Sequence, residues 1–312
     1  MSENEPPTDP EQPHGEATDD LGPHLLGRVP SEPDARDHKM GEKLKALQDA
    51  EAPAPDDSLI DKTFRQAIEE GYFTAWRSMY AVWRWIKDWI KRNPPQPPEP
   101  QPEPGPVPPA PPTPDQKVWS LNAQLDQGQT PHCVGFGWSA WGNCEPTLDA
   151  FDNDYAHGLY YEIKRTIDHA PEENVPVDQQ QGTSVRAGAK AMKNRGRIVE
   201  YVFAAPGAQG ITEINEWLLN HGSVVMGTVW LRQMFSPDAN GYVTVSGADM
   251  GGHCWLLLGY DKVADEYSAA DNSWGEGWGI KGRFKLRGAD FRKLYAYPDT
   301  EACAALEVAT AA

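Results

Sequence analysis

The chain has 312 residues, enough for one or two globular domains, but its composition indicates that part of it does not pack. It contains 29 prolines and 46 acidic against 28 basic residues, which gives a formal net charge of -18. Binding to a nucleic-acid backbone requires clustered Lys and Arg, and no such stripe occurs, so we expect no nucleic-acid partner.

The cysteines and the N-terminus favour an intracellular protein. Four cysteines are too few for a disulfide scaffold at this length, and none stands in a C-x-x-C pair typical of zinc sites. The start of the chain is acidic and proline-bearing, unlike a secretory signal, and no apolar stretch approaches the roughly 20 residues that span a bilayer. We therefore expect a cytoplasmic or otherwise intracellular location, without signal peptide or transmembrane helix.

Residues 1–57 have the composition of an acidic disordered tail. They include 15 acidic and 5 basic residues and few large apolar side chains. Burial of so few apolar groups cannot offset the entropy lost on ordering the chain.

Residues 58–93 form a Trp-rich segment with helical periodicity. Its large apolar side chains recur at steps of four and three: Phe64, Ile68, Tyr72, Trp76, Met79, Trp83, Ile86 and Ile90. This spacing predicts one amphipathic helix. Three roles stay open for it: docking on a protein partner or self-association, attachment to a membrane surface, and covering a site elsewhere in the chain as an inhibitory segment.

Residues 94–114 are predicted to be a linker, because 13 of these 21 residues are proline. Such a run adopts polyproline II and acts as a semi-rigid spacer. It separates the predicted helix from residues 115–312.

The last segment, residues 115–312, is long enough to bury the core of one domain and contains 8 of the 12 tryptophans. We expect helices near 133–141, at 155–167, at 184–194 and from Thr212 to Gly222. Strands are expected at 223–230, 254–260, 267–271 and 279–286. Helices followed by strands predict an α+β fold with a helical half and a β-rich half.

Three residues in this segment match the needs of a thiol nucleophile. Cys133 opens an apolar stretch, so a helix dipole is expected to lower its pKa. His253 follows two glycines and begins an apolar strand that would hold an imidazole rigidly. Asn272 lies 19 residues later, and its amide oxygen can fix the orientation of that ring.

These motifs resemble the papain-like cysteine peptidases. Asp126-Gln127-Gly128-Gln129 ahead of Cys133 is similar to the family's Gln-Gly motif, and Gly251-Gly252-His253 to its histidine motif. Asn272-Ser273-Trp274-Gly275-Glu276-Gly277-Trp278-Gly279 is similar to its asparagine motif. The resemblance covers residues 115–312. Around the nucleophile, Thr130-Pro131-His132-Cys133-Val134 departs from the family's C-G-[SA]-C-[WY] pattern.

The resemblance implies roles for further residues. It makes Gln127 the side-chain donor to an oxyanion and Trp274 a shield for the hydrogen bond between Asn272 and His253. It also implies that a substrate backbone pairs with Gly182, Thr183 and Ser184, and that Cys254 points into a specificity pocket. His132 is expected to lie on the surface or to face the substrate.

The sequence thus predicts a papain-like thiol protease that hydrolyses peptide bonds of a peptide or protein substrate through an acyl-enzyme on Cys133. No metal or organic cofactor is needed for this chemistry. Two alternatives stay open. The same catalytic set suits an isopeptidase or acyl-transferase, and the fold suits a catalytically silent peptide-binding module.

Overall fold

A computed structural model describes residues 26–32, 34, 39–50 and 113–307. The chain separates into two compact units, residues 1–44 with 113–312, and residues 45–112. The predicted helix at 58–93 and almost all of the linker at 94–114 lie outside the described residues, so both stay predictions. Among the helices of the described ranges, none has the length and apolar character needed to cross a membrane.

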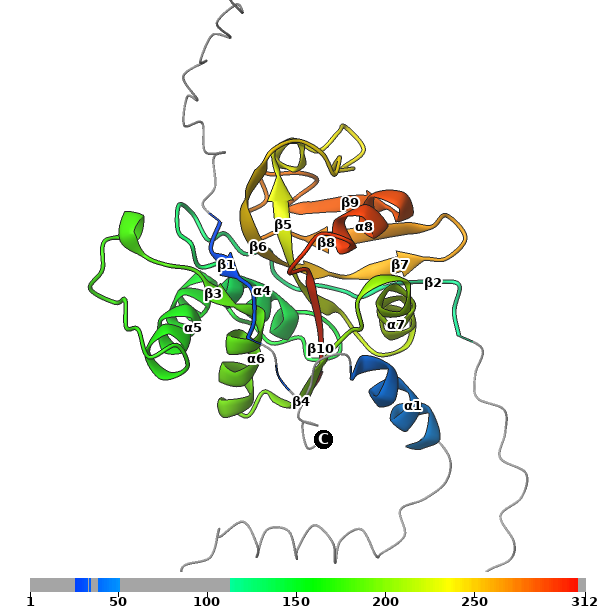
Figure 1. Ribbon diagram of the computed structural model, residues 1–312, viewed down its shortest axis with the longest axis horizontal. Helices are drawn as coiled ribbons and strands as arrows, with labels where there is room; N and C mark the ends of the chain where they lie inside the picture. The colour runs from blue at the N-terminus through cyan, green and yellow to red at the C-terminus, as the bar shows by residue number, and fades with distance from the viewer. Residues whose placement is uncertain (1–25, 33, 35–38, 51–112, 308–312) are drawn as a thin grey trace, which may run out of the picture. The chain divides into compact units, whose positions relative to one another are not determined.

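Three helices form the helical half. They are α4 (Cys133–Asn143), α5 (Asn153–Thr166) and α6 (Val185–Asn194). Helix α4 lies between α5 and the sheet (Figure 1). Each of its residues is buried, and its sequence of glycines, tryptophans and small side chains suits burial on all sides. Helix α6 begins where predicted, because the Ser184 side chain caps it by accepting from the Ala187 N–H.

The β-rich half is one twisted sheet of eight strands in the described part of the chain. The strand order is β2 (Gln116–Val118), β7 (Gly259–Asp261), β8 (Glu266–Asp271), β6 (Asp249–Leu257), β5 (Val224–Leu231), β10 (Glu301–Glu307) and β4 (Ile198–Phe203). Strand β9 (Arg283–Arg287) pairs with β8. The adjacent strands pair antiparallel, and helices α7 (Gly207–Asn220) and α8 (Gly288–Tyr295) pack beside them (Figure 1). The α+β prediction is confirmed.

Helix α7 begins at Gly207 rather than at the predicted Thr212. The hydroxyl of Thr212 bonds the Ala208 carbonyl inside the helix, so it caps nothing. Pro206 precedes the first turn and lacks the N–H that a helix start leaves unpaired. Strands β4 and β10 and helix α8 were not predicted either.

The N-terminal residues differ most from expectation. Residues 28 and 29, predicted to lie in a disordered tail, form strand β1 (Arg28–Val29), which pairs in parallel with β3 (Thr183–Ser184). Helix α1 (Met40–Ala50) follows and buries Met40 and Leu44. The disordered-tail prediction is therefore wrong for this stretch. Contacts with residues far along the chain supply the burial that its own composition lacks.

Candidate active site

Cys133 is the first residue of α4 and is fully buried. Its sulfur accepts hydrogen bonds from the backbone N–H groups of Cys254, Gly27 and Val134. Cys254 follows His253 on β6, so the sheet brings the thiol beside the histidine strand. The structure thus places together two motifs that are 120 residues apart.

Burial raises the pKa of the Cys133 thiol to about 11, against the lowering effect of the N–H donors and of the Arg28 charge. We expected the helix dipole to lower this pKa. That expectation fails in the described state, because loss of water around the thiolate outweighs the hydrogen bonds and the Arg28 charge. The thiol is accordingly protonated at neutral pH.

His253 and Asn272 are both fully buried and are joined by a hydrogen bond from the imidazole Nε2 to the amide Oδ1. The backbone holds Asn272 in place, since its N–H donates to the Gly282 carbonyl at 3.1 Å and its carbonyl accepts from the Gln124 side chain at 2.9 Å. With Nε2 on the amide, Nδ1 is the ring nitrogen that can exchange a proton with a thiol.

Two tryptophans enclose the His253 ring. Trp274 stacks on it, with ring centroids 4.8 Å apart and an angle of 25° between the planes. Trp230 meets it edge-on at 5.0 Å. This dry, low-dielectric surrounding strengthens the bond to Asn272.

Gln127 is buried on the loop that precedes α4. Its backbone N–H donates to the Ser273 carbonyl at 2.9 Å, which ties this loop to the asparagine motif. One side-chain amide proton donates to the Thr130 carbonyl at 2.8 Å. An oxyanion role for Gln127 would use the second amide proton.

A segment that lies far before Cys133 in the sequence covers the thiol. We call residues 26–32 the cleft segment. The Gly27 carbonyl accepts from the Thr183 N–H at 2.8 Å, and β1 pairs with Thr183 and Ser184, where a substrate backbone was expected (Figure 1). On the opposite side, the segment passes close to Gly252 of β6.

Glycines permit this close approach. A Cβ on Gly27 would lie 1.8 Å from the Pro131 carbonyl oxygen, and one on Gly182 would lie 1.8 Å from the Gly27 carbonyl oxygen. A Cβ on Gly252 would lie 2.2 Å from the Arg28 carbonyl oxygen. The cleft segment therefore lies between the loop before Cys133, strand β3 and the histidine strand.

Arg28 anchors the cleft segment. Its guanidinium donates to the Glu301 carboxylate at 2.5 Å and to the carbonyl of Asp299, and the Arg28 side chain is only 3% exposed. The other Glu301 carboxylate oxygen accepts from the Ser31 N–H at 3.1 Å.

Cys254 is fully buried on β6, and its sulfur faces Gly137 of α4. Burial raises its pKa well above the usual value, with a further rise from Cys133 and an opposing effect of Arg28. The place of Cys254 in a specificity pocket stays a prediction. Its electrostatic interactions with Arg28 and Glu301 indicate that it lies near this ion pair.

His132 is buried, which corrects the expectation that it lies on the surface or faces the substrate. Its ring stacks on Tyr160 and forms hydrogen bonds with His157 at 2.8 Å and Gln180 at 2.7 Å. Burial lowers the pKa of His132 to about 4, so the ring is neutral at neutral pH. Sequence reasoning missed this cluster because its partners come from α5 and the loop after it.

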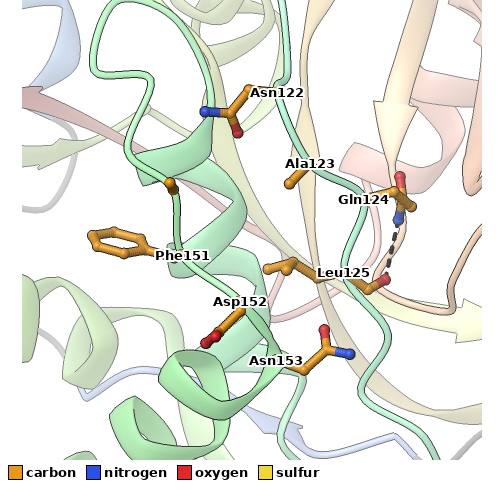
Figure 2. Close-up of a pocket in the computed structure, with 8 residues that line it drawn as sticks. Asn122, Ala123, Gln124, Leu125, Phe151, Asp152 and Asn153 are labelled. Carbon is orange, nitrogen blue, oxygen red and sulfur yellow. Dashed lines mark hydrogen bonds between the residues drawn. The ribbon is translucent and has the colours of Figure 1, made fainter.

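A surface hollow lies apart from these groups. It is lined by residues 122–125 and 150–153, and Figure 2 shows the Gln124 amide turned toward the Leu125 carbonyl within it. It contains neither Cys133 nor His253. Within the described ranges, no cluster of His, Cys, Asp and Glu is arranged to hold a metal ion.

Comparison with known proteins finds a family match over part of the chain. Residues 149–296, just under half of the chain, match the family described as papain family cysteine protease, and the resemblance seen in the sequence is confirmed over these residues. The match includes His253 and Asn272, while Gln127 and Cys133 precede it. The Cys133 and Gln127 assignments therefore rest on the motif and the geometry.

Individual relatives are more distant. Cathepsin B of Dictyostelium discoideum is 40% identical over 50 residues, which are 16% of this chain and 16% of that protein. Xylellain, a cysteine protease from Xylella fastidiosa, aligns with a TM-score of 0.45 at 14% identity over 92% of this chain and 97% of its own. Digestive procathepsin L 3 of Tenebrio molitor larval midgut aligns with a TM-score of 0.36 at 16% identity over 63% and 71%.

Proposed function

We propose that this protein is a cysteine peptidase that hydrolyses peptide bonds through a thioester on Cys133. The observation that carries the proposal is the buried hydrogen bond between His253 and Asn272, close to Cys133. The residue after His253, Cys254, donates its backbone N–H to the Cys133 sulfur. A thiol, an imidazole and an orienting amide in this order are the groups that thiol acyl transfer requires.

In the proposed reaction the Cys133 proton passes to Nδ1 of His253, and the thiolate attacks the substrate carbonyl carbon. The backbone N–H of Cys133 and the Gln127 amide stabilise the resulting oxyanion. As the C–N bond breaks, the imidazolium gives its proton to the leaving amine. Water, deprotonated by His253, then cleaves the thioester, which releases the acid and restores the thiol.

The cleft segment makes the described state latent. It occupies the backbone-pairing position at Thr183, and what it presents to the Cys133 sulfur is the Gly27 N–H rather than a carbonyl carbon. Nucleophilic attack needs an electrophilic carbon, so the segment blocks the site without being a substrate there. A substrate can bind only after this segment leaves.

The proposed substrates are peptide or protein chains, in an intracellular location as the sequence predicts. The helix at 58–93 stays a predicted docking element for a protein partner or a membrane surface. Isopeptidase or acyl-transfer activity on the same residues differs only in the amine of the substrate or in the acceptor of the acyl group.

The test is incubation of the full chain carrying Gly27→Ala, which should displace the cleft segment, with a mixed peptide library in H₂¹⁸O. Hydrolysis predicts ¹⁸O in each newly formed carboxyl group by mass spectrometry, and Cys133→Ala added to the same chain should abolish it. New amide products without ¹⁸O would instead establish acyl transfer. A folded chain that forms neither product would overturn the peptidase proposal.

A further inference from the structure

His132 joins the start of the nucleophile helix to a loop far along the chain. Its carbonyl accepts the Phe136 N–H at 3.2 Å, so its backbone belongs to the first turn of α4 and moves with Cys133. Its ring is buried, and Nε2 lies 2.7 Å from the Gln180 Oε1 on the loop that leads into β3. One side chain therefore connects α4 with the strand along which the cleft segment lies.

The Gln180 amide fixes the direction of this hydrogen bond. Its Nε2 donates to the Val175 carbonyl at 3.0 Å, which leaves Oε1 as the acceptor that faces His132. Nε2 of His132 must then carry a proton, and its Nδ1 is left to accept from Nδ1 of His157 at 2.8 Å. Burial lowers the pKa of both histidines, which favours this neutral arrangement.

The residues between Gln180 and β3 are held on both sides. The Gln181 N–H donates to the Glu172 carboxylate at 3.0 Å. The Gly182 carbonyl accepts from the Lys164 ammonium group at 3.3 Å. Lys164 and Glu172 are themselves buried and form an ion pair at 3.2 Å. In such close-packed surroundings a shift of Gln180 is passed on to β3 rather than absorbed by the loop.

The cleft segment shows what depends on this connection. Gly27 donates its N–H to the Cys133 sulfur and offers its carbonyl to the Thr183 N–H at 2.8 Å. A single residue thus bridges the thiol and β3, so the separation of these two groups determines how a bound backbone meets the sulfur. The four cysteines are free thiols, so hydrogen bonds and not a disulfide must keep this separation. Misplacement of a reacting group by about 1 Å can lower a rate by about 100-fold.

We propose that His132 is a positioning residue for the peptidase reaction. Through Gln180 it holds Thr183 at a fixed separation from the Cys133 sulfur, so that the carbonyl carbon of a peptide bound along β3 lies within reach of the thiolate. His132 acts only through these hydrogen bonds. The positioning role rests on the proposed function, whereas the connection between α4 and β3 can be tested without catalysis.

Two substitutions of His132 separate its two hydrogen bonds. His132→Gln keeps an N–H donor near the position of Nε2 and can still bond Gln180, whereas His132→Asn keeps an acceptor near Nδ1 and reaches only His157. Both remove the ring that stacks on Tyr160, so each is the packing control for the other. Gln180→Met keeps the length of the side chain without an amide oxygen and removes the same bond from the other side.

The first arm of the test measures peptide turnover by the full chain carrying Gly27→Ala. Adding His132→Asn or Gln180→Met should lower kcat at least about tenfold and leave KM within about threefold, because the substrate still binds along β3 but is displaced from the thiol. Adding His132→Gln should leave kcat within about threefold. The two damaging substitutions combined should lower kcat no more than either alone, since they remove one bond. Equal kcat values in His132→Asn and His132→Gln, at equal melting temperatures, would overturn the proposal.

The second arm needs no turnover. In the otherwise wild-type chain Gly27 bridges the sulfur and Thr183, so a change in their separation should weaken closure of the cleft. The rate of Cys133 alkylation by iodoacetamide should rise about fivefold in His132→Asn and Gln180→Met, the loss expected for one hydrogen bond, and stay within about twofold in His132→Gln. Equal rates in all four chains would overturn the connection. The expected alkylation pattern without turnover in any chain would count against the peptidase function and not against the connection.

Discussion

The backbone N–H of Gly27 donates a hydrogen bond to the sulfur of Cys133, so the chain covers its own candidate nucleophile. The same glycine lies so close to the Pro131 carbonyl that a methyl group on it would overlap that oxygen at 1.8 Å. Closure of the cleft therefore depends on a position that takes no part in the proposed chemistry.

Gly27→Ala should open the cleft. The methyl group would meet backbone atoms of Pro131, and such overpacking costs about 1–3 kcal/mol, or roughly five- to 150-fold in the open population. The second-order rate of Cys133 alkylation by iodoacetamide should rise accordingly. Gly158→Ala is the control, because a Cβ there meets nothing within 4 Å. An unchanged rate for Gly27→Ala would mean that the segment does not govern access.

The pH dependence of alkylation should differ between the closed and opened chains. Burial raises the pKa of Cys133 to about 11 in the closed state, so wild-type labelling should be slow at pH 7 and increase up to about pH 11. Opening the cleft hydrates the thiolate and should shift the midpoint to lower pH in Gly27→Ala. Identical midpoints, measured by the mass of the carbamidomethyl adduct from pH 6 to 11, would contradict burial as the cause.

Asn272→Ala should lower kcat in the Gly27→Ala background by about 100-fold while leaving KM within about threefold, because it removes orientation of His253 and not a reacting group. His253→Ala should be more severe. The exposed Asn220 at the end of α7 provides the control, since Asn220→Ala should have no effect. Equal loss in Asn272→Ala and His253→Ala, with unchanged melting temperatures, would mean that Asn272 has another role.

The His132 cluster should make stability sensitive to acid. Burial lowers the pKa of His132 from 6.5 to about 4, a difference that corresponds to roughly 3 kcal/mol. The unfolded chain takes up this proton first, so the free energy of unfolding should fall as the pH decreases from about 6.5 to about 4.

Urea unfolding at pH 7, 5.5 and 4 measures this loss. His132→Phe retains a ring to stack on Tyr160 but cannot be protonated, so its stability should decrease less between pH 7 and pH 4 than that of the wild type. Parallel decreases in the two proteins would assign the acid sensitivity to other groups.

The sequence predicted the parts of the fold that depend on local signals. Ser184 marks the start of α6 because a capping side chain acts within one turn. The apolar run after Cys133 identified α4, and the motifs around His253 and Asn272 identified the pair that the structure joins by a hydrogen bond. Short-range patterns were sufficient for these elements.

The missed features depend on distant partners. Arg28 lies in a segment whose composition indicates disorder, and its position depends on distant partners such as Glu301 on the unpredicted strand β10 and Thr183 on β3. His132 was expected to lie near the surface because the sequence does not show that Tyr160 and Gln180 cover it. Such contacts join residues with no shared periodicity, so no local pattern reports them.

The most direct test of the central claim is covalent labelling by a peptidyl epoxide of the full chain carrying Gly27→Ala, with peptide mapping by mass spectrometry. The four cysteines are all buried thiols, so the map distinguishes a catalytic site from general reactivity. We predict an adduct on Cys133 alone, which is lost when His253→Ala is added. An adduct on Cys254, or labelling of Cys133 that persists undiminished without His253, would contradict it.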